Sequence, residues 1–159
     1  MSLLNKVCDT LKKRHLHIAT AESCTGGLLA HLLTNITGSS DYFDQGVISY
    51  SNSSKMELLG VSENILKQYG AVSEQTAQAM ASGIRQRAKV DIGIATTGIA
   101  GPTGGTPEKP VGLAYIGIAT KHHVQVKQFI FHGDRIQNKE NTCIEALCFL
   151  LETIETLQD

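Results

Sequence analysis

The sequence predicts the α/β fold class: a single-domain α/β sandwich in which a mixed sheet carries helices on both faces. Short apolar runs typical of strands alternate with segments whose apolar residues recur at helical spacing. One run, residues 90–97, is almost entirely apolar or small, which is typical of a strand buried on both faces. Two later runs, separated by a tight Lys121-His122 turn, indicate an antiparallel hairpin.

The first part of the chain is predicted to alternate between helix and strand. Apolar residues that share one helical face, such as Val7 and Leu11, indicate the first helix. Gly46 precedes a short apolar run that predicts the second strand. The predicted helices span 2–14 and about 26–36, and the predicted strands span 16–20 and 47–50.

The rest of the chain carries helix-start signals and three apolar runs. Serines at 51–54, Ser62 and Ser73 are typical N-caps, and Asp134 begins the last helix. The expected helices span about 53–59, 62–68, 73–87 and 134–157, and the expected strands span 90–97, 111–120 and 123–131. A long loop rich in Gly and Pro separates the first two of these strands, and such loops are often functional.

Composition bounds the function. At 159 residues, we expect one domain covering 1–159 with a substantial core. The net charge of −1 disfavours a nucleic-acid partner. Because the sequence shows no apolar run of membrane-spanning length and no signal-peptide core, we expect a soluble, cytoplasmic protein. The four cysteines form no C-x-x-C pair, so no metal site is expected.

The stretch Thr20–Gly27 joins the first predicted strand to the following helix. One interpretation is a capped turn in which Ser23 caps the helix. The other makes Ser23 a nucleophile beside unpaired N–H groups at the positive end of a helix, where an oxyanion or phosphate is favoured. The adjacent Cys24 is either a rival nucleophile, since a helix N-terminus lowers a thiol pKa, or a small packing residue.

A nucleophilic serine needs a base within reach, and no Ser-His-Asp arrangement is evident. Lys55 lies in the first turn of a predicted helix, where the dipole favours the neutral amine. It could act as the base if burial or a nearby cation lowered its pKa. The alternative is a solvated surface lysine.

Two further features lie at the ends of predicted strands, where open α/β sheets bind ligands. The glycines of the 98–105 loop would let the backbone approach a ligand, or the loop is a long turn stiffened by prolines. Arg135 could grip a phosphate, or it is an exposed arginine at a helix start.

Five segments together resemble the CinA C-terminal domain family, which includes stand-alone nicotinamide-nucleotide amidohydrolases. The match extends over nearly the whole chain in the same order. The segments are TAESCTGG (20–27), GSSDYFDQGVISYSNSSK (38–55), GAVSEQTA (70–77), TTGIAGPTGGTPEKPVG (96–112) and FHGDR (131–135).

The resemblance implies a serine amidase, without metal or cofactor, that hydrolyses the carboxamide of nicotinamide mononucleotide to nicotinate mononucleotide and ammonia. Ser23 falls on the family's nucleophile and Lys55 on its general base, with Tyr50 in a supporting role. Arg135 would contact the substrate phosphate. The remaining implied substrate-binding residues are Thr25, Gly26, Gly27, Thr97, Gly98 and Gly101, and the backbone oxyanion hole would be formed by Cys24, Thr25 and Gly26.

Two other functions stay open. The same loops could bind a nucleotide without chemistry, as a non-catalytic nucleotide-binding or interaction module. Alternatively, Cys24 could carry out thiol chemistry in place of Ser23. In each case we expect a small-molecule pyridine nucleotide as the partner, no contact with a membrane, and a homo-oligomer.

Overall fold

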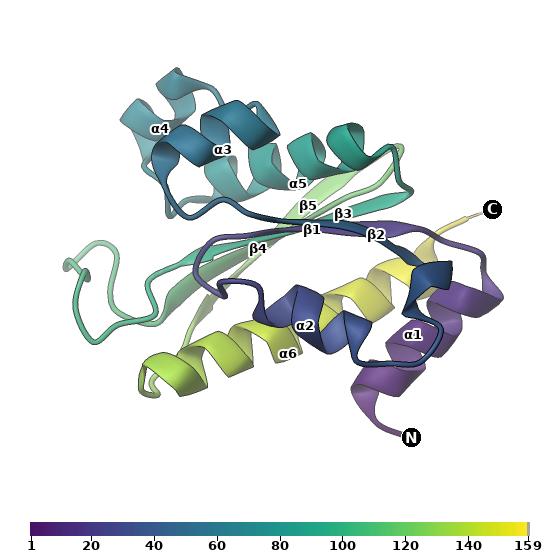
Figure 1. The fold of residues 1–159 in the computed structure, drawn as a ribbon. Coiled ribbons are helices and arrows are strands. Elements are labelled where there is room, and N and C mark those ends of the chain that lie inside the picture. The colour runs from purple at the N-terminus through teal and green to yellow at the C-terminus, as the bar shows by residue number, and fades with distance from the viewer. Residues whose placement is uncertain (159) are drawn as a thin grey trace.

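A five-stranded mixed sheet runs through the middle of the molecule in the computed structural model, which describes residues 1–158 (Figure 1). The outer strand β2 pairs in parallel with β1, which also pairs in parallel with β3, whereas β4 and β5 continue the sheet in antiparallel pairs. In spatial order the strands are β2 (Phe43–Ile48), β1 (Ile18–Glu22), β3 (Ile92–Gly98), β4 (Leu113–Ala119) and β5 (Val124–Ile130). The predicted mixed sheet and hairpin are confirmed.

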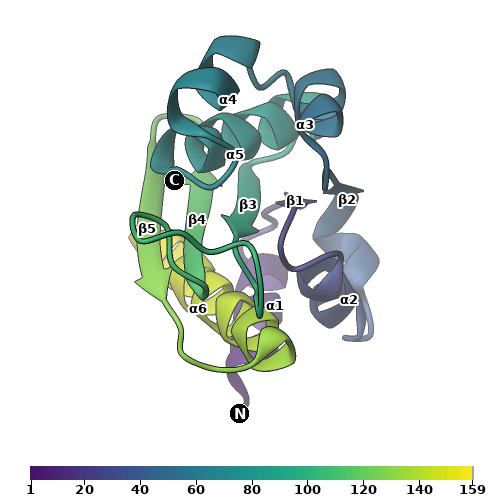
Figure 2. The same ribbon diagram turned by 90° about the vertical axis from the view of Figure 1, so that its left-hand side faces the viewer.

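Helices cover both faces of the sheet, as predicted (Figures 1 and 2). One face carries α1 (Leu3–Lys13), α2 (Leu28–Thr34) and α6 (Arg135–Thr156). The other carries α5 (Glu74–Ala88), with α3 (Asn52–Leu59) and α4 (Glu63–Tyr69) packed against it. A 3-10 turn, η1 (Ser39–Asp41), precedes β2. No helix within residues 1–158 is both long and apolar enough to cross a lipid bilayer.

Each face of the sheet has its own apolar core, because β1 and β3 are covered from both sides. The core beneath α1, α2 and α6 includes Val7, Leu11, Leu29, Leu33, Phe149 and Leu150. The core beneath α5 includes Ala21, Leu59, Val61, Met80, Ile84 and Ala95. These two cores hold the strands of the sheet at fixed positions relative to the helices.

The packing of α3 on α5 decides where Lys55 lies. Ser51 caps α3 by accepting a hydrogen bond from the Ser54 N–H at 3.1 Å, which begins the helix immediately after the β2 segment. Gly83 of α5 lets the two helices approach closely, since a Cβ there would lie 2.0 Å from the Leu59 carbonyl oxygen. Lys55 is therefore directed from α3 toward the sheet and is 1% exposed.

The carboxyl ends of the parallel strands β1, β2 and β3 meet at one edge of the sheet. The loop between β3 and β4 extends from this edge, and α6 begins beside it, at the left of Figure 1. The same end faces the viewer in Figure 2. Ligands bind at this edge in open α/β sheets, so it is the first place to look for a site.

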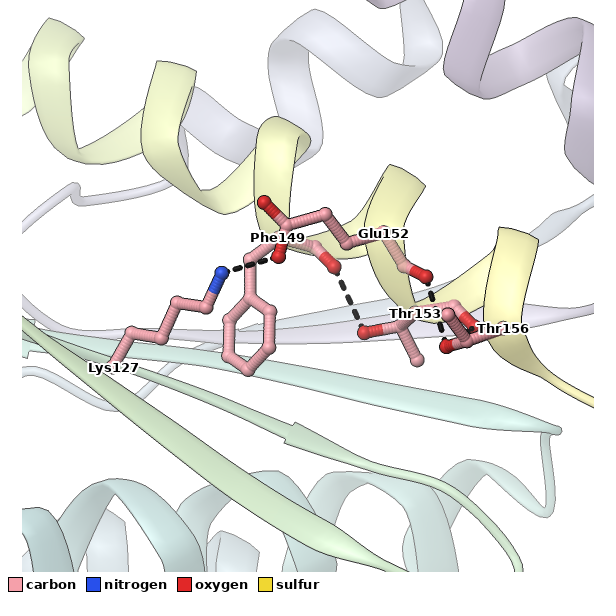
Figure 3. A network of polar contacts seen from close by, with 5 residues as sticks. All are labelled: Lys127, Phe149, Glu152, Thr153 and Thr156. Atoms are coloured by element: carbon pink, nitrogen blue, oxygen red, sulfur yellow. Dashed lines mark hydrogen bonds and ion pairs between the residues drawn. The ribbon is translucent and has the colours of Figure 1, made fainter.

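The antiparallel edge of the sheet is fastened to the C-terminal half of α6 (Figure 3). Lys127 of β5 forms an ion pair with Glu152, and its ammonium lies 4.5 Å from the centre of the Phe149 ring. Thr153 and Thr156 donate hydrogen bonds to carbonyl oxygens one turn earlier in the helix. The Lys127 contacts join β5 to α6, whereas the two threonine hydrogen bonds lie within the helix.

Some predicted boundaries are wrong. β2 covers 43–48 and not 47–50, because Gly46 lies within the strand, where it pairs with Thr20 of β1. Exposed polar residues on this edge strand obscured its pattern. β1 ends two residues later than predicted, at Glu22. The following helix begins at Leu28, because Gly26 and Gly27 have φ values of +61° and +101° and form the turn before it.

Candidate active site

Ser23 and Lys55 meet at the carboxyl edge of the sheet although 32 residues separate them. Ser23 directly follows β1, and its backbone N–H donates to the Thr96 carbonyl of β3 at 2.9 Å. The Lys55 Nζ lies 3.1 Å from the Ser23 Oγ. Both side chains are buried, Ser23 being 8% exposed, so the contact is formed away from bulk water.

The surroundings of Lys55 suit a neutral amine. Its Nζ donates to the carbonyl oxygens of Ser49 at 2.9 Å and Tyr50 at 3.1 Å. An ammonium would donate to Ser23 Oγ as well as to the two carbonyls, whereas a neutral amine has two N–H groups for the carbonyls and one lone pair for the Ser23 hydroxyl proton. Burial lowers the pKa of Lys55 from 10.5, and the nearby Cys24 sulfur opposes this more weakly.

Glu22 organises the turn that carries Ser23. Its carboxylate is 1% exposed and accepts hydrogen bonds from the N–H groups of Leu29 at 2.8 Å and Ala30 at 3.0 Å, both in the first turn of α2. The Thr25 hydroxyl adds a third, at 2.6 Å. The positive end of α2 is therefore occupied by a carboxylate of the protein itself. From the sequence, this helix end was predicted to bind an oxyanion or phosphate. That interpretation missed that Glu22 accepts the hydrogen bonds from the N–H groups there.

The backbone after Ser23 still offers donors. The Gly26 N–H already donates to the Ser23 carbonyl at 3.1 Å. Within the described residues, the N–H groups of Cys24 and Thr25 donate to no carbonyl or side-chain oxygen. These two N–H groups belong to the residues that directly follow Ser23. A serine nucleophile needs backbone donors close to its hydroxyl to form an oxyanion hole.

A pocket of about 190 Å³ opens beside the Ser23–Lys55 pair. Of the predicted substrate-binding residues, Thr97, Gly98 and Arg135 line it, together with the predicted supporting residue Tyr50. Thr97 is held by a hydrogen bond from its hydroxyl to the Ala71 carbonyl at 2.7 Å. The full lining is Ser23, Cys24, Tyr50, Lys55, Ala71, Val72, Thr97, Gly98, Ala100 and Arg135, which includes one guanidinium, one lysine amine and no carboxylate.

Arg135 lies at the start of α6 and joins two segments at the pocket. Its Nη1 donates to the Gly101 carbonyl at 2.7 Å, and its Nη2 donates to the Tyr50 hydroxyl at 3.1 Å. The Tyr50 side chain is 59% exposed, so it forms part of the rim rather than the floor of the pocket.

Thr25, Gly26, Gly27 and Gly101 do not line this pocket. The Thr25 hydroxyl is buried between Glu22 and the Thr96 hydroxyl, 2.7 Å away. Gly26 and Gly27 form the turn before α2. Gly101 contributes its carbonyl to Arg135.

Cys24 lines the pocket but its thiol is deeply buried. Burial raises the pKa of the Cys24 thiol to about 12, and the neighbouring Glu22 carboxylate also raises it. A thiol with such a pKa is almost entirely protonated at neutral pH, whereas thiol nucleophiles react as thiolates. Burial therefore disfavours Cys24 as a thiolate nucleophile.

Two residues of this region were missed by sequence reasoning. Glu22 directly precedes Ser23, and an acidic residue before a helix start was an available signal. Asn138 lies one turn into α6, 2% exposed, and donates to the Ala100 carbonyl at 3.0 Å. Nothing in the local pattern distinguishes this Asn from an exposed helix residue, because its partner is 38 residues away in the chain.

Comparisons with known proteins bear on the family and the fold of the chain. Residues 1–154 match the CinA C-terminal domain family model. A CinA-like protein from Chloroherpeton thalassium is 51% identical over 158 residues, covering 97% of this chain and 38% of that protein. The chain spans about a third of the length of the curated relatives it matches.

Solved structures of the same superfamily match the whole fold. A competence-damaged protein (CinA) superfamily protein from Klebsiella pneumoniae has a TM-score of 0.94 and 32% identity, covering 98% of this chain and 97% of that chain. A competence/damage inducible protein from Agrobacterium tumefaciens has a TM-score of 0.93 and 38% identity, covering 97% of this chain and 94% of that chain. At these identities the likeness extends beyond the fold to the sequence.

Proposed function

Because the chain belongs to the CinA C-terminal domain family, we propose that it is an amidase that converts nicotinamide mononucleotide to nicotinate mononucleotide and ammonia. The observation that carries this proposal is the buried Lys55 Nζ, 3.1 Å from the Ser23 Oγ at the floor of a pocket. A serine hydroxyl beside a lysine of lowered pKa is an activated nucleophile and its base.

In the first half of the reaction, the Ser23 hydroxyl proton passes to the neutral Lys55 amine as Oγ bonds to the carboxamide carbon. The carbonyl π electrons move to oxygen, and the N–H groups of Cys24 and Thr25 stabilise the resulting oxyanion. When the oxyanion collapses, the C–N bond breaks, and the Lys55 ammonium returns its proton to the departing ammonia. The product on the enzyme is an ester between Ser23 and the nicotinoyl group.

In the second half, water attacks this ester. Lys55, neutral again, takes a proton from the water as the new C–O bond forms. The bond to Oγ then breaks, and the proton on Lys55 returns to Ser23. The carboxylic acid formed loses its proton to solvent, and nicotinate mononucleotide leaves as a carboxylate.

Charge supports a phosphate-bearing substrate. Arg135 is the cation of a pocket that no carboxylate lines. Arg135 keeps unused N–H donors besides those bound to Gly101 and Tyr50, and guanidinium groups bind phosphate oxygens in pairs. A pyridinium ring would bring a further positive charge close to Lys55, which lowers the pKa of an amine. The substrate would thus contribute to its own activation.

The test is the formation of ammonia and nicotinate mononucleotide by the purified protein. Ser23→Ala should abolish turnover, and so should Lys55→Met, which fills the same space without a base. Lys67→Met is the matched control, because Lys67 is exposed and, among the residues that the structure describes, forms an ion pair only with Glu63 on its own helix. Full turnover in either of the first two variants would reject the assignment of the pair.

The second candidate is a nucleotide-binding module without chemistry. The same pocket and Arg135 would support it, whereas the lowered pKa of Lys55 favours the amidase. Wild-type protein that binds nicotinamide mononucleotide but releases no ammonia would decide for the binding module.

A further inference from the structure

Two neighbouring carbonyl oxygens of the loop after β3 are held by side chains from the start of α6. Asn138 Nδ2 donates to the Ala100 carbonyl at 3.0 Å, and Arg135 Nη1 donates to the Gly101 carbonyl at 2.7 Å. Ala100 lines the candidate active-site pocket. The start of α6 therefore holds the backbone of this loop where the loop borders the site.

Asn138 is built into this contact from both sides. Its Oδ1 accepts a hydrogen bond from the Gly133 N–H at 3.0 Å, while its Nδ2 holds Ala100. At 2% exposure, neither bond can be replaced by bulk water. An aspartate would lose the donor toward Ala100, and an apolar side chain would leave both backbone groups unpaired.

The guanidinium of Arg135 is oriented by the loop in turn. Its contacts with the Gly101 carbonyl and the Tyr50 hydroxyl use one N–H of each Nη. A guanidinium carries five N–H groups, so one remains on each of its three nitrogens. With its plane set by two partners, Arg135 can present these donors to an anion without first ordering its side chain.

We propose that Asn138 is a positioning residue for substrate specificity: through the Ala100 and Gly101 carbonyls it aims Arg135 at the phosphate of the nucleotide. This rests on the proposed function, since it takes the pyridine nucleotide as the ligand. It assigns to Asn138 no contact with substrate. Removing the Asn138 amide lets the loop shift, and Arg135 then loses one of the partners that orient it.

The experiment compares two ligands that differ only in the phosphate. Binding of nicotinamide mononucleotide and nicotinamide riboside is measured by calorimetry in a Ser23→Ala background, where no hydrolysis disturbs the equilibrium. Asn138→Ala should weaken mononucleotide binding about five-fold, the size expected for one lost hydrogen bond. Riboside binding should stay unchanged, so the preference for the phosphorylated ligand falls by the same factor.

Gln137→Ala is the matched control. Gln137 forms the reciprocal capping box with Asp134 in the same turn of α6, and within residues 1–158 no hydrogen bond joins its side chain to the loop after β3. The Gln137→Ala substitution weakens the start of α6. If Asn138 only stabilised this turn, Gln137→Ala and Asn138→Ala would therefore change the preference for the mononucleotide equally. Asn138→Asp, which keeps the acceptor for Gly133, gives the same comparison if the alanine variant folds poorly.

An unchanged preference in Asn138→Ala and Asn138→Asp, or an equal fall in Gln137→Ala, would overturn the inference. Wild-type protein that binds the mononucleotide without releasing ammonia would reject the amidase but leave this inference intact. If the Ser23→Ala protein failed to bind the mononucleotide, both the amidase proposal and the role of Asn138 would be rejected.

Discussion

Replacing Lys55 by methionine tests the protonation state on which the proposed mechanism depends. Lys55 is 1% exposed, and within the described residues its Nζ contacts two carbonyl oxygens and a hydroxyl but no carboxylate. Burial accordingly lowers its pKa from 10.5. Methionine has a similar length and no charge, so the variant removes the titration while keeping most of the packing.

The sign of the effect follows from proton binding. Between the lowered pKa of the folded protein and 10.5, the unfolded chain binds a proton at Lys55 that the folded protein does not. The free energy of unfolding of the wild type therefore rises with pH across this window, by at most about 1.4 kcal/mol per pH unit for one proton. Below the folded pKa both states are protonated, and this contribution to the slope vanishes.

The assay is urea unfolding of the wild type and Lys55→Met at several pH values between about 7 and 10. Other titrating groups contribute equally to both proteins and cancel in the difference. With a denaturant slope of about 1–3 kcal/mol per M, the unfolding midpoint of the wild type should gain about 0.5–1.4 M per pH unit relative to the variant.

Lys67→Met controls for the loss of a lysine as such, because Lys67 is exposed and should leave the pH dependence of the wild type unchanged. Parallel stability curves for the wild type and Lys55→Met would refute the reasoning. They would mean that Lys55 keeps its proton in the fold over this whole range and cannot serve as a base there.

Three further outcomes are expected. Glu22→Gln should lower kcat and destabilise the fold by about 1–3 kcal/mol, because an amide cannot accept from all the donors that the buried carboxylate now satisfies. Steady-state kinetics measures the first effect and urea unfolding the second, and a wild-type kcat would contradict the role of Glu22 in holding the Ser23 turn. Cys24→Ser should keep turnover within about three-fold, whereas Ser23→Ala should not, since the Cys24 thiol has a pKa of about 12 and stays protonated; the reverse result would establish thiol chemistry. An analogue with a neutral benzene ring in place of the pyridinium should be turned over with a lower kcat and bound more weakly, because it brings no charge to lower the pKa of Lys55 further. Equal kcat values for the charged and neutral compounds would exclude substrate-assisted activation.

Local sequence pattern was sufficient for the fold class. The doubly buried β3, the β4–β5 hairpin and the serine-capped helices α3, α4 and α5 each carry a signal within a few residues, and the structure has them close to where they were predicted. The edge strand β2 was misplaced because only one of its edges pairs, so polar residues are tolerated along it and the apolar pattern is weak.

The pairing of Ser23 with Lys55 was suggested by resemblance and by the placement of both residues at strand ends. Their distance, by contrast, depends on α3 packing against α5 at Gly83, a contact between segments far apart in the chain. Burial of the lysine, and with it the direction of its pKa shift, is a consequence of the same packing.

The sequence by itself determined the alternation of helices and strands and placed chemically active side chains after β1, β2 and β3, because propensity, capping and periodicity are local properties. Only the tertiary structure decided which of those groups remain available. Glu22 occupies the positive end of α2, the Thr25 hydroxyl turns inward to it, and the Gly26 N–H is used by the Ser23 carbonyl. The physical reason is that a buried donor or acceptor must find a partner, and which partner it finds depends on contacts that no local pattern encodes.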